Sequence, residues 1–108
     1  ALAHQVVRSG RRFDGVFCMT DTLAMGFIRG LADCGGHVPN DMAVVGFDGI
    51  NESDYFVPSL TTVSTDLNDL AAKAVNLLLK RIDEDGTDFK PEKLTADFRL
   101  VRRESTGR

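Results

Sequence analysis

Short apolar runs alternate with stretches of helical period along the first half of this sequence. The runs at 15–19 and 42–47 contain almost no polar residue, which is typical of strands buried on both faces of a parallel sheet. Between them, residues 22–34 place an apolar side chain about every four positions, as an amphipathic helix does. Strand, helix and strand at this spacing predict a βαβ unit with a right-handed crossover.

The second half predicts one more strand and the longest helix. Residues 60–64 are rich in β-branched Thr and Val, which favours a strand. After Asp66, which is suited to cap a helix, apolar residues form one stripe of helical period over 67–83. Gly86 is expected to end this helix, and residues 94–103 are expected to be extended, as one or two strands. The stripe consists of Leu67, Leu70, Ala71, Ala74, Leu77, Leu78 and Ile82.

Two shorter elements complete the pattern. Residues 1–10 have the pattern of the last turns of a helix, with Gly10 where a C-cap belongs. Residues 51–56 predict a short helical turn that ends before Pro58. The alternation of strands and helices predicts an α/β fold with a parallel sheet flanked by helices.

Composition narrows the class of protein. The 108 residues are 43% hydrophobic and 27% charged, as in an ordinary globular domain and unlike a disordered chain. The formal net charge of −3 argues against DNA binding by this piece alone, because non-specific affinity comes from Lys and Arg on phosphates. No apolar run approaches the roughly 18 residues of a membrane span. Cys18 and Cys34 are read as reduced, packed thiols of a cytoplasmic protein.

Enzyme and metal chemistry find little support. Ser53 and Ser64 lack the G-x-S-x-G setting of a hydrolase nucleophile, and no histidine is suitably placed in sequence. The glycines form neither a phosphate-binding loop nor a dinucleotide fingerprint. His4 and His37 have no Cys, Glu or second His at ligand spacing. We therefore predict a protein that is not an enzyme and that needs no cofactor or metal.

Four segments resemble the LacI/GalR-type transcription regulators. The first is residues 13–26, FDGVFCMTDTLAMG, a strand followed by a helix; the second is residues 38–48, VPNDMAVVGFD. The third is residues 58–63, PSLTTV, and the fourth is residues 100–106, LVRREST. The segments occur in the order and with the spacing of that family and cover nearly the whole chain.

This resemblance implies the type I periplasmic-binding fold, in which two α/β subdomains are joined by three crossover strands and the effector binds between them. It implies that residues 1–59 belong to the C-terminal subdomain. Residues 60–93 would then form a crossover and a helix of the N-terminal subdomain, and residues 94–108 the return crossover and the C-terminal end. The first half of the effector domain and a helix-turn-helix headpiece would lie outside this sequence.

A chain of this extent would have a physical weakness. The long helix would lack most of the sheet against which the family packs it. Leu70, Ala74, Leu77 and Leu78 would then form an exposed apolar patch. We expect the piece by itself to be unstable, to swap segments with a neighbour, or to be held by another piece.

Two strand ends carry the candidate ligand-binding residues. Asp48 ends a buried strand, where open α/β sheets bind ligands, and its carboxylate can accept two hydrogen bonds from sugar hydroxyls or base nitrogens. The resemblance implies an effector contact there; the alternative is a turn-forming Asp before Gly49. Thr20 ends the first strand and could contact a ligand or cap the next helix, and the family often has Asn or Gly there. For Asp21 we expect the N-cap of the helix.

The resemblance also suggests an assembly and a function. Met25 and Phe56 match positions that the family uses at its dimer interface, although core packing would explain them equally well. The predicted function is allosteric: a sugar or nucleobase-like effector controls how a homodimer binds operator DNA through the headpiece. The alternative is a periplasmic sugar-binding receptor of an ABC transporter. A signal peptide upstream would favour that receptor, and a helix-turn-helix would favour the regulator.

Overall fold

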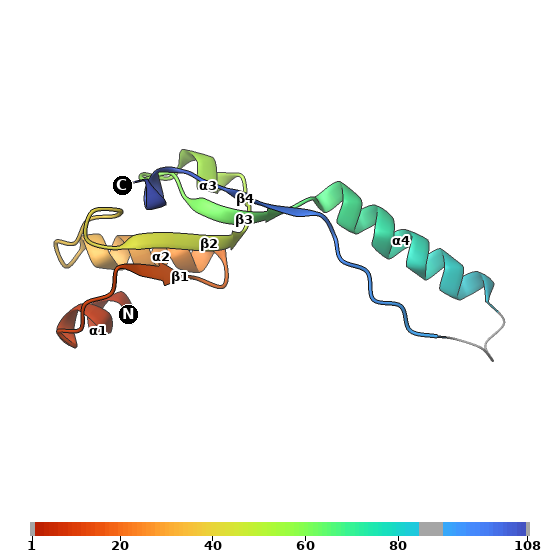
Figure 1. Ribbon diagram of the computed structural model, residues 1–108, viewed down its shortest axis with the longest axis horizontal. Coiled ribbons are helices and arrows are strands. Elements are labelled where there is room, and N and C mark those ends of the chain that lie inside the picture. The colour runs from red at the N-terminus through yellow and green to blue at the C-terminus, as the bar shows by residue number, and fades with distance from the viewer. Residues whose placement is uncertain (1, 85–89, 108) are drawn as a thin grey trace. The chain divides into compact units, whose positions relative to one another are not determined.

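The computed structural model describes residues 2–84 and 90–107 (Figure 1). The chain divides into two compact units, one made of residues 1–64 with 100–108 and the other of residues 65–99. The subdomain boundaries expected at 59/60 and 93/94 stay predictions. Gly86, expected to end the long helix, lies outside the described residues.

The first unit is built on a parallel βαβ arrangement. Strands β1 (Gly15–Phe17), β2 (Ala43–Asp48) and β3 (Thr61–Thr65) lie side by side, and β2 pairs in parallel with both neighbours. The fourth strand of the sheet, β4 (Phe98–Val101), lies next to β3. The predicted α/β class and the order of elements are confirmed, with a single strand in the 94–103 stretch.

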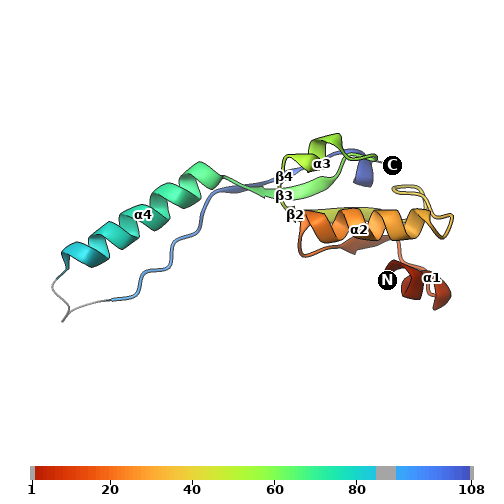
Figure 2. The same ribbon diagram turned by 180° about the vertical axis from the view of Figure 1, so that it is seen from behind.

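One helix covers a face of this sheet, and a second helix packs on the first (Figures 1 and 2). Helix α2 (Asp21–Ala32) packs on β2, and α1 (Leu2–Arg8) packs on α2. A Cβ on Gly30 would lie 2.9 Å from Ala3 Cβ, so glycine lets the two helices approach closely. The residues that form the core are Ala3, Ala24, Phe27, Ile28, Leu31, Met42, Val44 and Leu60. They join one face of α2 to the facing side chains of the strands, as the helical period predicts.

The C-terminal segment is hydrogen-bonded into the first unit. The buried Ser105 hydroxyl accepts a hydrogen bond from Thr61 N at 2.8 Å and donates one to Val44 O at 2.6 Å. Arg103 donates from Nη1 to Ser53 Oγ at 2.9 Å and pairs through Nη2 with Asp54 at 2.6 Å. These bonds join the ending to β2, β3 and the short helix α3 (Glu52–Tyr55), and a 3-10 turn, η1 (Glu104–Thr106), follows Arg103.

The second unit contains α4 (Leu67–Asp83), which ends as predicted. The Asp66 carboxylate caps it, accepting from Asn68 N and Asp69 N at 3.0 Å each, which confirms the predicted cap. No residue of α4 is buried. Leu70, Ala74 and Leu78 are exposed as predicted, whereas Leu77 is half-buried. Even this longest described helix is too short and too polar to cross a bilayer, and no other described helix could.

Polar contacts order the chain that follows α4 within the second unit. Lys73 Nζ donates to Asp69 Oδ2 at 2.6 Å and to Thr95 O at 2.9 Å, and Asp97 N donates to the same Asp69 oxygen at 2.8 Å. The Lys73 ammonium and the Asp97 N–H lower the pKa of Asp69, and the Asp69 carboxylate raises the pKa of Lys73. Hydrogen bonds thus supply the contacts that α4 lacks in apolar packing.

The cysteines differ from each other in environment. Both are free thiols. Cys18 is half-buried, and desolvation raises the pKa of its thiol, so the thiolate is disfavoured. Cys34 is exposed, so the prediction that it is packed is wrong: it lies in the turn after α2, beyond the last buried residue of that helix.

Candidate functional site

The loops that follow the parallel strands meet at one edge of the sheet, here named the carboxyl edge and made of residues 18–20 and 48–51. Parallel strands end on the same side, and the pairing of β1 with β2 continues into the loop, where Cys18 N donates to Val45 O at 2.8 Å. Thr20 and Asp48 therefore belong to the same edge of the sheet. Ligands of open α/β sheets bind at such edges.

Asp21 connects these loops by hydrogen bonds. Its side chain is fully buried, and Oδ2 accepts from Gly49 N and Ile50 N at 2.9 Å each. Oδ1 accepts from the Thr62 hydroxyl at 2.5 Å. One carboxylate therefore joins the start of α2 to the loop after β2 and to strand β3. Sequence reasoning missed this contact, because the partners of Asp21 lie 28 to 41 residues further along the chain.

The prediction that Asp21 is the helix N-cap is wrong. Thr20 has the extended backbone of an N-cap residue, with φ −143° and ψ 157°, and its Oγ1 accepts from Leu23 N at 3.2 Å. Asp21 is the first helical residue, and its carboxylate serves the neighbouring loop instead of its own helix. Both residue types can cap helices, so only the tertiary contacts separate the two roles.

A glycine provides the space for this carboxylate. A Cβ on Gly46 would collide with Asp21 Oδ1 and would lie 3.0 Å from Leu60 Cδ2 and 3.2 Å from Asp21 Cα. Gly46 is buried in β2 and pairs in register with Thr62, which also bonds Asp21. The glycine of the VVGFD segment is thus required by the close approach of Asp21.

Asp48 has an unusual backbone. Its φ is +116°, and it is the one described non-glycine residue with positive φ. Such a conformation costs about 1–3 kcal/mol and persists only where the surroundings enforce it. Gly49 follows with φ +74° and lies so close to Ser64 that a Cβ would be 2.6 Å from Ser64 Cβ. The exposed Asp48 side chain is therefore held at the carboxyl edge by a constrained turn.

Thr20 keeps some capacity to bind a ligand. Its hydroxyl accepts the Leu23 N–H as a cap, which leaves its own proton free to be donated elsewhere. The residue is half-buried. The ligand contacts predicted for Asp48 and Thr20 stay predictions; the structure places both residues at one edge and shows that Thr20 caps α2.

Apolar side chains adjoin the edge on the sheet face opposite α2. Phe17 and Phe47 contact edge to face, with ring centroids 6.5 Å apart, and are 61% and 38% exposed. Val45, opposite Phe17 in the register, is half-buried. Among the described residues, β1 and β2 are therefore covered on the α2 face only, and the predicted burial on both faces is not observed here.

The two residues of the predicted dimer interface are half-buried. Met25 and Phe56 both pack against the core cluster, which is the alternative role considered for them. Tyr55 and Val57, on either side of Phe56, are 84% and 86% exposed. An interface at Met25 and Phe56 stays a prediction.

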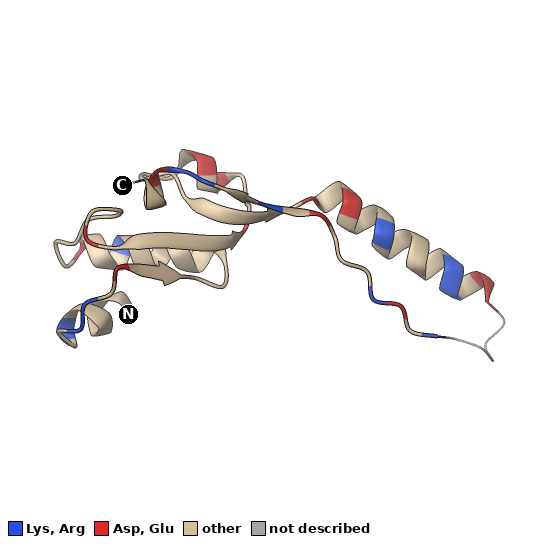
Figure 3. Ribbon diagram, viewed as in Figure 1, with Lys and Arg blue, Asp and Glu red and all other residues tan. Residues whose placement is uncertain are grey.

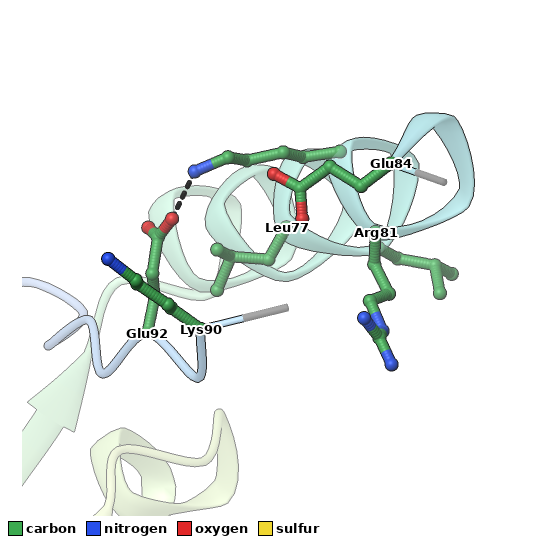
Figure 4. A pocket seen from close by; sticks show the side chains of 7 residues that line it. Leu77, Arg81, Glu84, Lys90 and Glu92 are labelled. Atoms are coloured by element: carbon green, nitrogen blue, oxygen red, sulfur yellow. Dashed lines mark hydrogen bonds and ion pairs between the residues drawn. The ribbon is translucent and has the colours of Figure 1, made fainter. Parts of the chain in front are cut away.

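Elsewhere among the described residues we find no second group of side chains suited to bind a ligand. A hollow of about 240 Å³ in the second unit is lined by Leu77, Leu78, Lys80, Arg81, Glu84, Lys90 and Glu92 (Figure 4). Lys80 and Glu92 form an ion pair. Helix α4 carries charges of both signs: Asp69 lies near its start, Lys73, Lys80 and Arg81 follow, and Asp83 ends it (Figure 3). No cluster of three or more metal-ligating side chains occurs among the described residues.

Comparison with known proteins defines the class. The family model of the periplasmic binding protein-like domain matches residues 2–106, so the chain belongs to that family. Within it, the resemblance to LacI-type regulators is confirmed. The HTH-type transcriptional repressor PurR of Actinobacillus pleuropneumoniae serotype 3 (strain JL03) is 40% identical over 90 residues. That match covers 83% of this chain and 27% of the relative.

Solved structures agree with this assignment. A LacI-family transcriptional regulator from Sanguibacter keddieii DSM 10542 superimposes with a TM-score of 0.89 at 45% identity. The match covers 97% of this chain and 39% of that one. A LacI-family regulator from Arthrobacter sp. FB24, in complex with lactose, has a TM-score of 0.78 at 34% identity, over 97% and 39% of the two chains. The lac repressor dimer bound to operator and the anti-inducer ONPF superimposes with a TM-score of 0.77 at 27% identity. That match covers 97% of this chain and 31% of the repressor chain.

The chain thus spans about a quarter to two fifths of the proteins it matches. The relatives named here are a transcriptional repressor and transcriptional regulators.

Proposed function

We propose that this chain supplies the effector-binding carboxyl edge of a LacI-type transcriptional regulator that senses a sugar or a nucleobase-like molecule. The observation that carries the proposal is Asp48, an exposed carboxylate with φ +116° at the end of β2. Strain of this kind clusters at ligand sites, where it pre-organises a side chain. The lactose complex of a 34% identical regulator supports a polyhydroxylated ligand.

The chemistry of the edge suits a hydrogen-bond donor. The Asp48 carboxylate accepts hydrogen bonds only, and it can take two from vicinal sugar hydroxyls or from a base N–H. Hydrogen bonds to a charged acceptor contribute about 1.5–3 kcal/mol each. The Thr20 hydroxyl has a proton to donate to a ligand oxygen. A pair of this kind, with one acceptor and one donor, would fix a ligand's orientation at the edge.

The effector would regulate by differential affinity. A ligand that binds one closure angle of the subdomains better shifts the equilibrium toward it, with couplings of about 1–3 kcal/mol. We propose residues 60–64 and 94–103 as the hinge crossovers and a cytoplasmic homodimer with Met25 and Phe56 at its interface. Operator DNA would be bound by a headpiece outside this sequence, at a half-site spacing set by the dimer. The lac repressor dimer bound to operator supports this arrangement.

The proposal is tested by ligand-induced stabilisation of the full-length protein. We would screen lactose, D-ribose and hypoxanthine by thermal shift. A ligand at 100 times its Kd stabilises the folded protein by about 2.7 kcal/mol, which raises the unfolding midpoint. Asp48→Ala should weaken ligand binding and clearly reduce the shift, because one of the two proposed polar contacts is lost. The matched control is Asp33→Ala, which removes an exposed carboxylate at the opposite end of α2. A strong shift that survives Asp48→Ala would refute the site.

Operator binding separates the regulator from the alternative, a periplasmic sugar receptor. The regulator's affinity for operator DNA should change when the stabilising ligand is added. A full-length protein that binds the ligand and shows no specific DNA binding would support the receptor.

A further inference from the structure

We infer that Asp21 is a positioning residue for ligand binding: its buried carboxylate holds the Gly49–Ile50 backbone and thereby keeps Asp48 in its binding conformation. The inference rests on the proposed function of Asp48. Asp21 makes no ligand contact in this scheme. It acts on the loop after β2 through two backbone hydrogen bonds, both at 2.9 Å.

The first step is the geometry of the loop. Asp48 has φ +116° and Gly49 φ +74°, so two successive residues leave the ordinary backbone regions. The N–H groups of Gly49 and Ile50 converge on the same Asp21 oxygen. A turn with these two amides free would relax, because a non-glycine residue at positive φ is strained. The bonds from Asp21 begin at the residue next to Asp48 and oppose that relaxation.

The second step is the rigidity of the anchor. Asp21 is fully buried as the first residue of α2, the helix that supplies half of the core residues. Its other oxygen is fixed by Thr62, a fully buried residue of β3. Among the described residues no cation pairs with this carboxylate; its bonding partners are these three donors. Charge-assisted hydrogen bonds of this type are about twice as strong as neutral ones.

The third step is the cost of the arrangement to the sheet. Gly46 has no side chain, and a Cβ there would collide with the Asp21 carboxylate. Strand β2 thus has no side chain at this buried position, and the Asp21 carboxylate occupies the space. The capping of α2 does not explain why Asp21 lies here, because Thr20 already caps that helix. The position of the carboxylate is explained by the loop it binds.

Three variants of the full-length protein test the inference. Asp21→Asn keeps the shape but replaces the charged acceptor by an amide. Thr62→Val removes the hydroxyl that fixes Asp21, whereas Thr62→Ser keeps it and serves as the conservative rescue. Hydrogen–deuterium exchange should show the amides of Gly49 and Ile50 exchanging on the order of tenfold faster in Asp21→Asn and Thr62→Val. Thr62→Ser should resemble the wild type. Unchanged protection of both amides in Asp21→Asn overturns the inference.

A binding cycle separates positioning from general destabilisation. With lactose as the probe, or D-ribose if that sugar gives the larger thermal shift, Asp21→Asn should weaken binding on the order of tenfold. In an Asp48→Ala background the same change should have an effect below about twofold, because Asp21 acts through Asp48. Equal losses in both backgrounds would show a purely structural role and overturn the inference.

Failure of the proposed function would look different. If Asp48→Ala leaves sugar binding unchanged, or if neither sugar binds the wild type, the proposed sugar site is refuted. The exchange measurement on Gly49 and Ile50 needs no ligand and decides the role of Asp21 in holding the loop in either case.

Discussion

Helices α2 and α4 have similar sequence patterns and opposite environments. Both have helical apolar periods and a side-chain N-cap, Thr20 for α2 and Asp66 for α4. Helix α2 buries six of its residues against the sheet and α1, whereas α4 buries none. Periodicity and caps therefore predict that a helix forms, and the available neighbours decide whether its apolar face is covered.

The difference also concerns what holds each unit together. A fully buried Leu or Phe contributes about 1.5–3 kcal/mol, and α2 places several in the core. Helix α4 relies on contacts such as the Asp69–Lys73 pair, and ion pairs near a helix surface contribute much less to stability than a buried apolar side chain does. We expect substitutions in the two units to differ accordingly.

The largest expected effect contrasts two leucines in the 108-residue chain. Leu31→Ala should destabilise by about 2–5 kcal/mol, because Leu31 is 4% exposed in the core. Leu78→Ala should change stability by about 0.5 kcal/mol or less, because Leu78 is 58% exposed. Urea unfolding followed by circular dichroism measures both. If Leu78→Ala lowered the free energy of unfolding as much as Leu31→Ala does, the contrast between the two helices would be wrong. Such a result would show that α4 packs against a second copy.

A smaller effect contrasts two glycines of the first unit. Gly46→Ala should destabilise the full-length protein by about 1–3 kcal/mol, because the methyl group would overlap the Asp21 carboxylate. Gly26→Ala meets nothing within 4 Å in the middle of α2 and should stabilise by about 0.5–1 kcal/mol. Thermal unfolding of both variants provides the measurement. Equal midpoints would mean that Asp21 can move aside without loss.

Asp48 offers a stability gain at the expense of binding. Asp48→Gly should stabilise the ligand-free protein by about 1 kcal/mol, since glycine adopts φ +116° without strain. Asp48→Asn should change stability less, because Asn tolerates positive φ better than most residues do. Both variants should bind lactose or D-ribose less tightly than the wild type. A destabilised Asp48→Gly would show that the Asp48 side chain makes stabilising contacts in the ligand-free state.

The smallest expected effect is the pH response of the second unit. The folded-state pKa of Asp69 is lowered, so its contribution is present above the ordinary aspartate pKa and is lost as the pH falls through the lowered value. The pKa of Lys73 is raised by the same Asp69 carboxylate, so Lys73 stays protonated throughout this acidic range and the pair is lost through Asp69 alone. Helix content by circular dichroism in the 108-residue chain should therefore decrease between pH 7 and 3. Asp69→Asn removes the titrating group of this pair, so the loss of helix content with falling pH should be smaller in that variant than in the wild type.

The family, the α/β class, the Asp66 cap and the limits of α4 could all be predicted from local sequence. Periodicity, cap chemistry and the four segments from FDGVF to LVRREST are properties of neighbouring residues. The Thr20 cap was only one of two options, since Asp21 is chemically as suitable. Asp48 was singled out by its place at a strand end, although neither its φ of +116° nor the role of Gly46 could be anticipated.

The sequence by itself determined which segments become helices and strands, because φ/ψ preferences, caps and apolar periods act over a few residues. Only the tertiary structure decided that Asp21 bonds the loop 28 residues away, that Gly46 makes room for it, and that the far face of β1 and β2 is uncovered among the described residues. Those facts depend on which distant segments meet. A hydrogen bond between residues far apart in sequence produces no periodic pattern of residue types from which it could be predicted.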